Sequence, residues 1–177
     1  MEKILIFSDL HGDSHSLEIL LERIEAEKAD LILSGGDLGI NRLSEGLIFL
    51  KNIKVPFKSV RGNCDSAYHF IKNGLTIPPL YLKLSFNNRR LFLTHGDYYY
   101  DWKVLPVALN ENDVFITGHT HISKIEKTEG SPILLNPGSV TYPRDKNGPT
   151  YATIDKNRIQ IVSMQNFSVL NSFIFKD

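Results

Sequence analysis

The sequence predicts an α/β fold that begins with two parallel strands joined by a helix. Two short apolar runs, at 4–7 and 31–33, flank a segment of helical periodicity. The first run, Ile4-Leu5-Ile6-Phe7, is β-branched and aromatic and too short for an independent helix. A strand, a helix and a strand of these lengths form a βαβ unit, so the two strands are expected to be parallel with a right-handed crossover.

The connecting helix is predicted from about Ser14 to Lys28, and Asp13 or Ser14 can cap its first turn. Its apolar residues recur at helical spacing on one face: Leu17, Leu20, Leu21 and Ile24.

Further elements follow from the same patterns. The predicted helices lie at about 43–52, at 67–72 and at 102–109, the last made doubtful by Pro106. The predicted strands lie at 57–60, 80–86, 90–94, 113–117, 122–127, 132–135, 151–154, 158–163 and within 167–175. The strands at 80–86 and 90–94 are joined across Asn87-Asn88, a plausible hairpin turn. No repeat, low-complexity segment or linker interrupts the chain, so residues 1–177 are expected to form one domain.

Composition narrows the classes of protein. Of the 177 residues, 42% are hydrophobic, and 20 basic residues balance 20 acidic ones. This balance lacks the positive charge of a general nucleic-acid binder. No run of about 18 apolar residues predicts a membrane span, and the N-terminus lacks the layout of a signal peptide. A single cysteine, Cys64, excludes an internal disulfide and suits a reducing compartment, so we expect a cytoplasmic protein.

Polar side chains of metal-ligand type follow five predicted strands: Asp9, His11, Asp37, Asn63, His95, His119 and His121. Parallel strands end at one sheet edge, where open α/β sheets place their sites. Because alternate residues of an extended chain share a face, the pairs Asp9/His11 and His119/His121 are each expected to point one way.

Each residue alone has an ordinary structural interpretation. Asp9 can cap the next helix, Asp37 and Asn63 suit turns, and His95 can be a buried core residue. Together, four histidines and two acids would be costly to bury without partners, and a shared metal site accounts for all of them. Seven ligands exceed one tetrahedral zinc but suit two metals with a bridging carboxylate. His15 and His69 lack such neighbours and are expected to be solvated or structural.

The ordered motifs Asp9-x-His11, Gly36-Asp37, Gly62-Asn63 with Asp65, His95-Gly96 and Gly118-His119-x-His121 resemble the calcineurin-like metallophosphoesterases. The stretches 61–65, 93–96 and 136–139 look like those of the small bacterial and archaeal phosphodiesterases of the YfcE type. The resemblance runs from Lys3 to about Val162.

The resemblance implies a four-layer αββα sandwich of two mixed sheets flanked by helices. It also implies that Asp9, His11 and His121 hold one metal, that Asn63, His95 and His119 hold another, and that Asp37 bridges them. Asp37, Asn63, His95 and Asp65 would be catalytic. Mn²⁺ is a frequent activator in the family, and Ni²⁺, Fe²⁺, Co²⁺ or Zn²⁺ could substitute. Two cations about 3.5–4 Å apart activate a water and stabilise the phosphoryl oxygens.

Two positions depart from the pattern of the resembled proteins. Cys64 stands where larger members have a histidine that helps to protonate the leaving group, and a thiol with a pKa of about 8.5 is a poorer donor. Other YfcE-type proteins also carry cysteine there. We therefore expect a preference for esters with good leaving groups. Asp97 replaces a histidine that often follows the His-Gly pair, and either repulsion of an anionic substrate or support of an imidazole is consistent with it.

Three functions remain open at this stage: a metal-dependent phosphodiesterase acting on a small phosphodiester, a phosphomonoesterase on the same site, and a non-catalytic protein-binding scaffold of the same fold. The complete set of seven ligand positions favours catalysis. The aromatic residues at 98–102 are candidates for a lid, a substrate-stacking surface or a contact in a homodimer or homotetramer.

Overall fold

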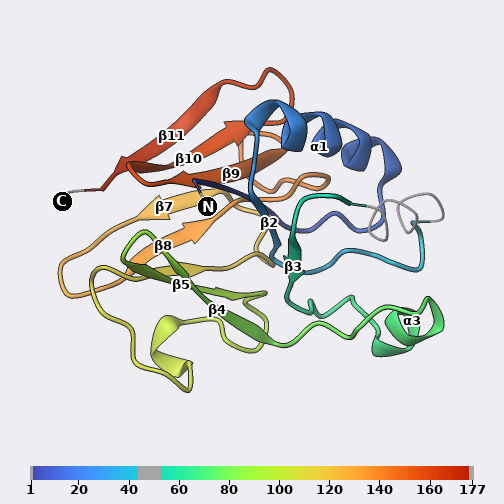
Figure 1. The fold of residues 1–177 in the computed structure, drawn as a ribbon, viewed down its shortest axis with the longest axis horizontal. Coiled ribbons are helices and arrows are strands. Elements are labelled where there is room, and N and C mark those ends of the chain that lie inside the picture. Colours follow the sequence, from blue (N-terminus) through green and yellow to red (C-terminus); the bar gives the residue numbers. More distant parts are fainter. Residues whose placement is uncertain (1, 44–52, 176–177) are drawn as a thin grey trace.

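The computed structural model describes residues 2–43 and 53–175. Its strands form two mixed sheets that lie face to face, as the resemblance predicts (Figure 1). The helices are α1 (Ser14–Glu27), α3 (Ala67–Lys72) and the 3₁₀ helix η1 (Trp102–Val104). The predicted helix at 43–52 falls, apart from Leu43, outside the described residues. None of the described helices is long and apolar enough to cross a membrane.

The first sheet has six strands in the order β11-β10-β9-β1-β2-β3. Their bounds are β1 Lys3–Phe7, β2 Leu31–Ser34, β3 Phe57–Ser59, β9 Thr150–Asp155, β10 Arg158–Ser163 and β11 Val169–Ile174. β1, β2 and β3 are parallel, whereas β9, β10 and β11 are joined by antiparallel pairings, β9 to β1 included. The predicted βαβ unit is therefore confirmed.

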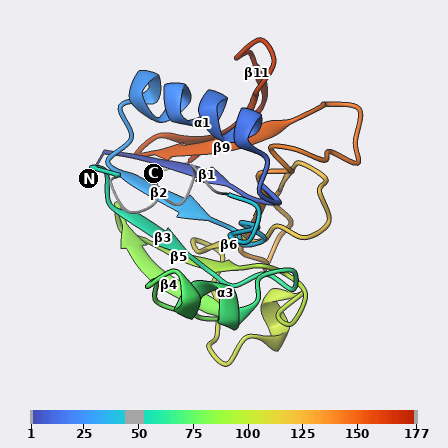
Figure 2. The same ribbon diagram turned by 90° about the vertical axis from the view of Figure 1, so that its right-hand side faces the viewer.

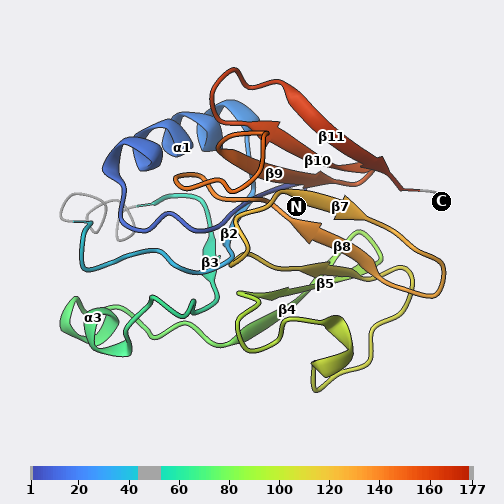
Figure 3. The ribbon, with the colours of Figure 1, turned by 180° about the vertical axis from the view of Figure 1, so that it is seen from behind.

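The second sheet has five strands in the order β4-β5-β6-β8-β7. Their bounds are β4 Tyr81–Phe86, β5 Arg89–Thr94, β6 Val114–Ile116, β7 Lys124–Glu126 and β8 Ile133–Asn136. β5, β6 and β8 are parallel and lie between two antiparallel edge strands. Figure 3 shows this sheet beneath the first one, with β7 below β9, β10 and β11.

Strand alternation assigns the apolar residues to separate layers. Ile4 and Ile6 of β1 point into the core between the sheets, whereas Leu5 and Phe7 pack in the layer that contains α1. Because both faces of β1 are covered from Ile4 to Phe7, these four residues are all apolar. The Asp13 carboxylate caps α1 by accepting a hydrogen bond from the Ser16 amide, 2.7 Å away.

The outer layer beneath the second sheet is much reduced. The helix predicted at 102–109 is wrong, because only the single turn η1 forms there. Leu105 adopts extended backbone with ψ of 147°, as expected for a residue that precedes proline. In Figures 1 and 3 the segment around η1 lies below the second sheet, on the side opposite α1.

Candidate metal centre

The seven predicted ligands follow the carboxyl ends of strands from both sheets. Those after β1, β2 and β3 belong to the first sheet, and those after β5 and β6 belong to the second. The structure brings side chains from these five strands together at the edge shared by the two sheets. Asp9, Asp37, His95 and His121 are buried, His11 is half-buried, and Asn63 and His119 are exposed.

Five of the seven residues have left-handed backbone: Asp9, His11, Asp37, His119 and His121, with φ between 50° and 65°. The expectation of an extended chain at the pairs Asp9/His11 and His119/His121 was therefore wrong. Side chains with a Cβ rarely adopt this conformation, and it concentrates at functional sites. Between His119 and His121 the chain makes a tight turn, in which the Thr120 amide donates to the Gly118 carbonyl, 2.7 Å away.

Asp9, His11 and His121 form a first cluster. The Nε2 atoms of the two histidines are 3.3 Å apart, and Asp9 Oδ1 lies 3.2 Å from His121 Nε2 and 3.9 Å from His11 Nε2. His121 Nδ1 donates to the Tyr142 carbonyl at 2.7 Å, and the Tyr142 ring lies 5.5 Å from that of His11.

Asn63, His95 and His119 form a second cluster. His95 Nδ1 donates to the Gly35 carbonyl at 2.7 Å, which turns Nε2 toward Asn63 Oδ1, 3.0 Å away. The ring centroids of His95 and His119 are 5.1 Å apart. His119 and His121, although two residues apart, therefore contribute to different clusters.

Asp37 lies between the two clusters. Its Oδ2 is 3.8 Å from His11 Nε2 and 3.5 Å from His95 Nε2. Its Oδ1 accepts a hydrogen bond of 2.8 Å from the Cys64 amide. This contact connects the loop after β2 with the loop after β3, and it leaves Oδ2 directed at both clusters.

The lone pairs of this arrangement fit divalent cations. Because a carbonyl only accepts, Tyr142 and Gly35 fix the protons of His121 and His95 on Nδ1. In the neutral rings, each Nε2 then presents a lone pair to an oxygen atom. Within residues 2–43 and 53–175, the fully buried Asp9 Oδ1 has no hydrogen-bond donor as long as the His121 ring, whose Nε2 lies 3.2 Å away, is neutral. A cation or an added proton is therefore needed between these atoms.

The pKa shifts of Asp9, His11 and His121 are consistent with a site for a cation. Hydrogen bonding to Asp9 raises the pKa of His121, and it does so against the effect of burial. Burial raises the pKa of Asp9, but contacts with His121 and Ser8 outweigh burial and leave that pKa below its usual value. Burial lowers the pKa of His11. The carboxylate that raises the pKa of His121 is thus the one that a cation bound to His121 would contact.

Three further predicted positions are less central. Asp65 is buried and accepts hydrogen bonds from the Gly62 and Gly39 amides, at 3.0 and 3.3 Å. This geometry supports a positioning role for Asp65. Cys64 is an exposed residue at the rim of the site. Partial burial of its thiol and, next, its contact with Asp37 raise the pKa of the thiol to about 11. Asp97 is also exposed.

The sequence reasoning missed the contributions of the segment 136–142. Ser139 Oγ donates to the Asp9 carbonyl at 2.9 Å and accepts from the Tyr142 amide at 2.8 Å. Asn136 Nδ2 donates to the Gly118 carbonyl at 2.8 Å. The signal that was available is the Asn136-Pro137-Gly138-Ser139 stretch, which contributes to the family resemblance but was assigned no role in the site.

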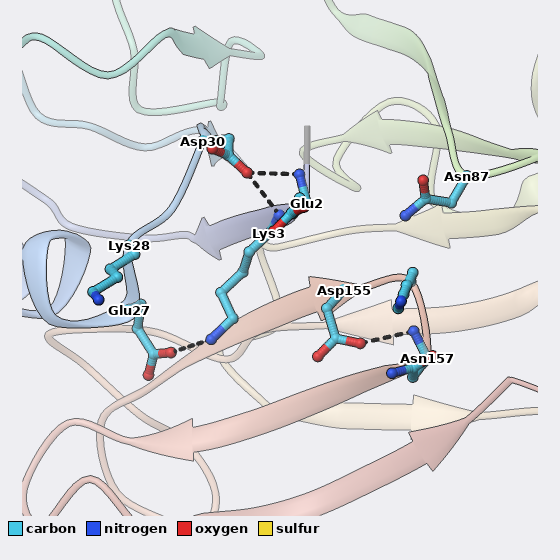
Figure 4. A pocket seen from close by; sticks show the side chains of 9 residues that line it. Glu2, Lys3, Glu27, Lys28, Asp30, Asn87, Asp155 and Asn157 are labelled. Atoms are coloured by element: carbon cyan, nitrogen blue, oxygen red, sulfur yellow. Dashed lines mark hydrogen bonds and ion pairs between the residues drawn. The ribbon is translucent and has the colours of Figure 1, made fainter.

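A cavity of about 730 Å³ has none of the predicted ligands in its lining. Figure 4 shows that two of its carboxylates already have partners, Glu27 with Lys3 and Asp30 with the amides of Glu2 and Lys3. The cavity is lined from the amino end of β1 and the turn between β9 and β10, at the opposite end of these strands from the clusters. We therefore place the functional site at the clusters.

Two face-to-face mixed sheets, with histidine, aspartate and asparagine side chains gathered at their common edge, are the arrangement expected of a metal-dependent hydrolase of phosphoric esters. The calcineurin-like phosphoesterase superfamily domain matches residues 2–158 of this chain. The chain belongs to this family, and it is a hydrolase acting on phosphoric ester bonds.

Individual relatives support this assignment. The chain is 31% identical to "Phosphodiesterase YfcE" of Escherichia coli (strain K12) over 180 aligned positions, which cover 96% of both proteins. It is 32% identical to a "Probable metallophosphoesterase" of Methanothermobacter thermautotrophicus over 145 positions, 78% of this chain and 77% of that protein. The solved structure of the E. coli YfcE phosphoesterase matches with a TM-score of 0.81 and 28% identity, covering 98% of this chain and 100% of that one.

Proposed function

We propose that this protein is a divalent-metal-dependent phosphodiesterase that hydrolyses a small phosphodiester. The observation that carries the proposal is the convergence of oriented histidine lone pairs and a buried, unpartnered Asp9 oxygen on either side of Asp37. The similarity to a protein named phosphodiesterase over 96% of the chain supports the choice of substrate class.

Asp9, His11 and His121 would hold one cation, and Asn63, His95 and His119 would hold the other. Asp37, whose Oδ2 is within 4 Å of a histidine of each cluster, would be shared. Two bound cations supply an activated water and neutralise the charge of the phosphoryl oxygens. Mn²⁺ is the metal that we propose first.

The chain's own residues prepare the site for this chemistry. The carbonyls of Gly35 and Tyr142 hold two imidazoles in one tautomer and one orientation, as the outer partners of metal-binding histidines do. Asp65 fixes the loop that carries Asn63 through the Gly62 amide. Of the side chains at the rim, Cys64 is a weak proton donor for a leaving group because of its raised pKa.

Two further attributes belong to the proposal. The single cysteine suits the reducing cytoplasm, which is the compartment we propose. A homodimer or homotetramer is the assembly we propose, and sedimentation velocity tests it.

The decisive experiment is hydrolysis of bis-p-nitrophenyl phosphate by chelator-stripped protein titrated with Mn²⁺, with metal stoichiometry measured by calorimetry. We expect two sites and metal-dependent turnover, both impaired in Asp37→Asn. Asp30→Asn, which removes a charge at the remote cavity, is the matched control and should behave as the wild type. Two bound metals without diesterase turnover would refute the proposal. Hydrolysis of p-nitrophenyl phosphate would then indicate a monoesterase, and inactivity on both esters would indicate a scaffold.

A further inference from the structure

A second cavity, of about 430 Å³, lies on the outer face of the five-stranded sheet beside the metal centre. Phe115 of β6 and Leu134 of β8 form its floor, because their neighbours along each strand point into the core between the sheets. Tyr100 and Trp102 form another wall. The cavity lies beside the segment where the predicted helix at 102–109 does not form, and Trp102 of η1 lines it.

The cavity shares a wall with the metal centre. Thr117 and Thr120 line it, and Thr120 lies between His119 and His121 in sequence. Asn136 holds this loop by donating to the Gly118 carbonyl at 2.8 Å and to Thr120 Oγ1 at 3.1 Å. Both His119 and Thr120 are exposed, so the rim between the centre and the cavity is open to a ligand.

The views of the molecule agree with this placement. In Figure 2 the yellow-green segment that contains η1 lies on the side of the molecule toward which β1 and β2 point. The carboxyl ends of these strands lead directly to Asp9 and Asp37. The cavity and the metal centre are therefore on the same side of the protein.

We propose that this cavity is a subsite for a planar aromatic substituent of the phosphodiester. The inference rests on the proposed function, and it adds the class of organic group that the enzyme prefers. Its volume is in the range of small-molecule sites of about 300–1,000 Å³. Three aromatic side chains, Tyr100, Trp102 and Phe115, offer ring faces and edges, while the Thr117 hydroxyl offers a polar contact. An alkyl substituent would make none of the ring–ring contacts.

Trp102 is the only tryptophan of the chain, so its fluorescence reports on this cavity without any need for catalysis. We would titrate metal-free and Zn²⁺-loaded protein with diphenyl phosphate and with dimethyl phosphate. Zn²⁺ has no redox activity and a filled d shell. We expect diphenyl phosphate to change the emission of Trp102 in a saturable way and dimethyl phosphate to leave it unchanged.

A pair of variants separates the subsite from general effects on the loop. Tyr100→Ala removes a side chain that lines the cavity, and Tyr98→Ala removes one from the same loop that does not line it. Both side chains are well exposed, at 71% and 64%, so neither substitution should disturb folding. We expect Tyr100→Ala to weaken the binding of diphenyl phosphate and Tyr98→Ala to leave it unchanged.

The kinetic comparison uses bis-p-nitrophenyl phosphate and methyl p-nitrophenyl phosphate, which share a leaving group and differ in the second substituent. With Mn²⁺, Tyr100→Ala should lower kcat/KM about fivefold to tenfold for the first substrate, as expected for one lost aromatic contact. It should change the second substrate less than twofold.

The outcomes distinguish the two proposals. Metal-dependent diester hydrolysis without any response of Trp102 to diphenyl phosphate would overturn the subsite and leave the proposed function intact. An equal loss for both substrates in Tyr100→Ala would also overturn it. A response of Trp102 in a protein that hydrolyses no diester would support the aromatic site and contradict the proposed function.

Discussion

The substitution Gly62→Ala tests whether contact between two loops holds Asp37 in place. A Cβ at Gly62 would lie 2.4 Å from the Asp37 amide nitrogen and 2.1 Å from its Oδ1. The nitrogen is backbone, so no change of rotamer relieves the contact. A normal separation of at least 3.4 Å requires the loops after β2 and β3 to move apart by about 1 Å.

This displacement acts on the residue that lies between the two ligand clusters. Functional constellations are held to within about 0.5 Å, and a misplacement of about 1 Å costs roughly 100-fold in rate. Overpacking of this kind destabilises proteins by about 1–3 kcal/mol. We therefore expect Gly62→Ala to lose about 100-fold in Mn²⁺-dependent kcat/KM and about 1–3 kcal/mol in the free energy of unfolding.

Gly74→Ala is the matched control. Gly74 has φ of 69°, and no atom lies within 4 Å of a Cβ placed there. The alanine should cost about 1–2 kcal/mol through its left-handed backbone alone and leave catalysis unchanged. Urea denaturation and diester hydrolysis are measured on both variants. Wild-type activity of Gly62→Ala would refute the reasoning, and an equal loss of activity in Gly74→Ala would attribute the effect to stability.

Three further predictions concern the leaving group, the pH and the metal. Cys64→His should raise kcat/KM by about 100-fold for diesters with alkyl leaving groups and much less for p-nitrophenyl diesters. The reason is that imidazolium is a better proton donor than a thiol whose pKa is about 11. Equal gains in kcat/KM across a series of leaving groups would contradict this prediction. Glu27 is half-buried and has a lowered pKa, since hydrogen bonds from Lys3 and Tyr151 outweigh the effect of burial. The contribution of the Glu27 carboxylate to the free energy of unfolding is thus fully present above pH 4.5 and is lost as the pH falls through the pKa of Glu27 in the folded protein. Glu27→Gln should cost about 1 kcal/mol in the free energy of unfolding at pH 7 and progressively less as the pH falls below 4.5. A cost that stays constant in urea unfolding across this range of pH would exclude the effect. Metal at about 100 times its Kd should stabilise the protein by about 2.7 kcal/mol and raise Tm by roughly 5–10 °C; differential scanning fluorimetry should show no such rise in His121→Ala, and an unchanged rise would remove His121 from the ligands.

The strands and their order of appearance were accessible from the sequence. β1 and β2 are covered on both faces, so their residues are apolar without interruption and stand out in the chain. The lack of an α-helix at 102–109 could not be predicted in this way. The apolar residues there contact the outer face of the second sheet, but beyond η1 they form no helical turn. Apolar residues such as Leu105 and Val107 are expected in a helix that packs on the sheet and equally in an irregular segment that does so, and their pattern does not distinguish the two.

The ligand residues were accessible for a different reason. Each one follows a strand that could be recognised, and the parallel order of β1, β2 and β3 brings their carboxyl ends to one edge. Extended-chain periodicity, however, predicted that His119 and His121 point the same way, and in the structure they contribute to different clusters. The contacts of Tyr142 with His121 and of Ser139 with Asp9 link residues 21 and 130 positions apart, and no local pattern contains such information.

The left-handed backbone at the predicted ligand positions is held in place by contacts between loops. Conformations of this kind cost about 1–3 kcal/mol each and persist only where surrounding contacts fix them. Here the Asp9 amide donates to the Gly36 carbonyl and the His11 amide to the Asp37 carbonyl, at 3.1 and 2.8 Å. The His119 amide donates to Asp9 Oδ2 at 3.1 Å and thereby joins the two sheets. Asp9, His11 and His119 are thus each held by the loop after another strand, so contacts of the fold itself offset the cost of their left-handed backbone.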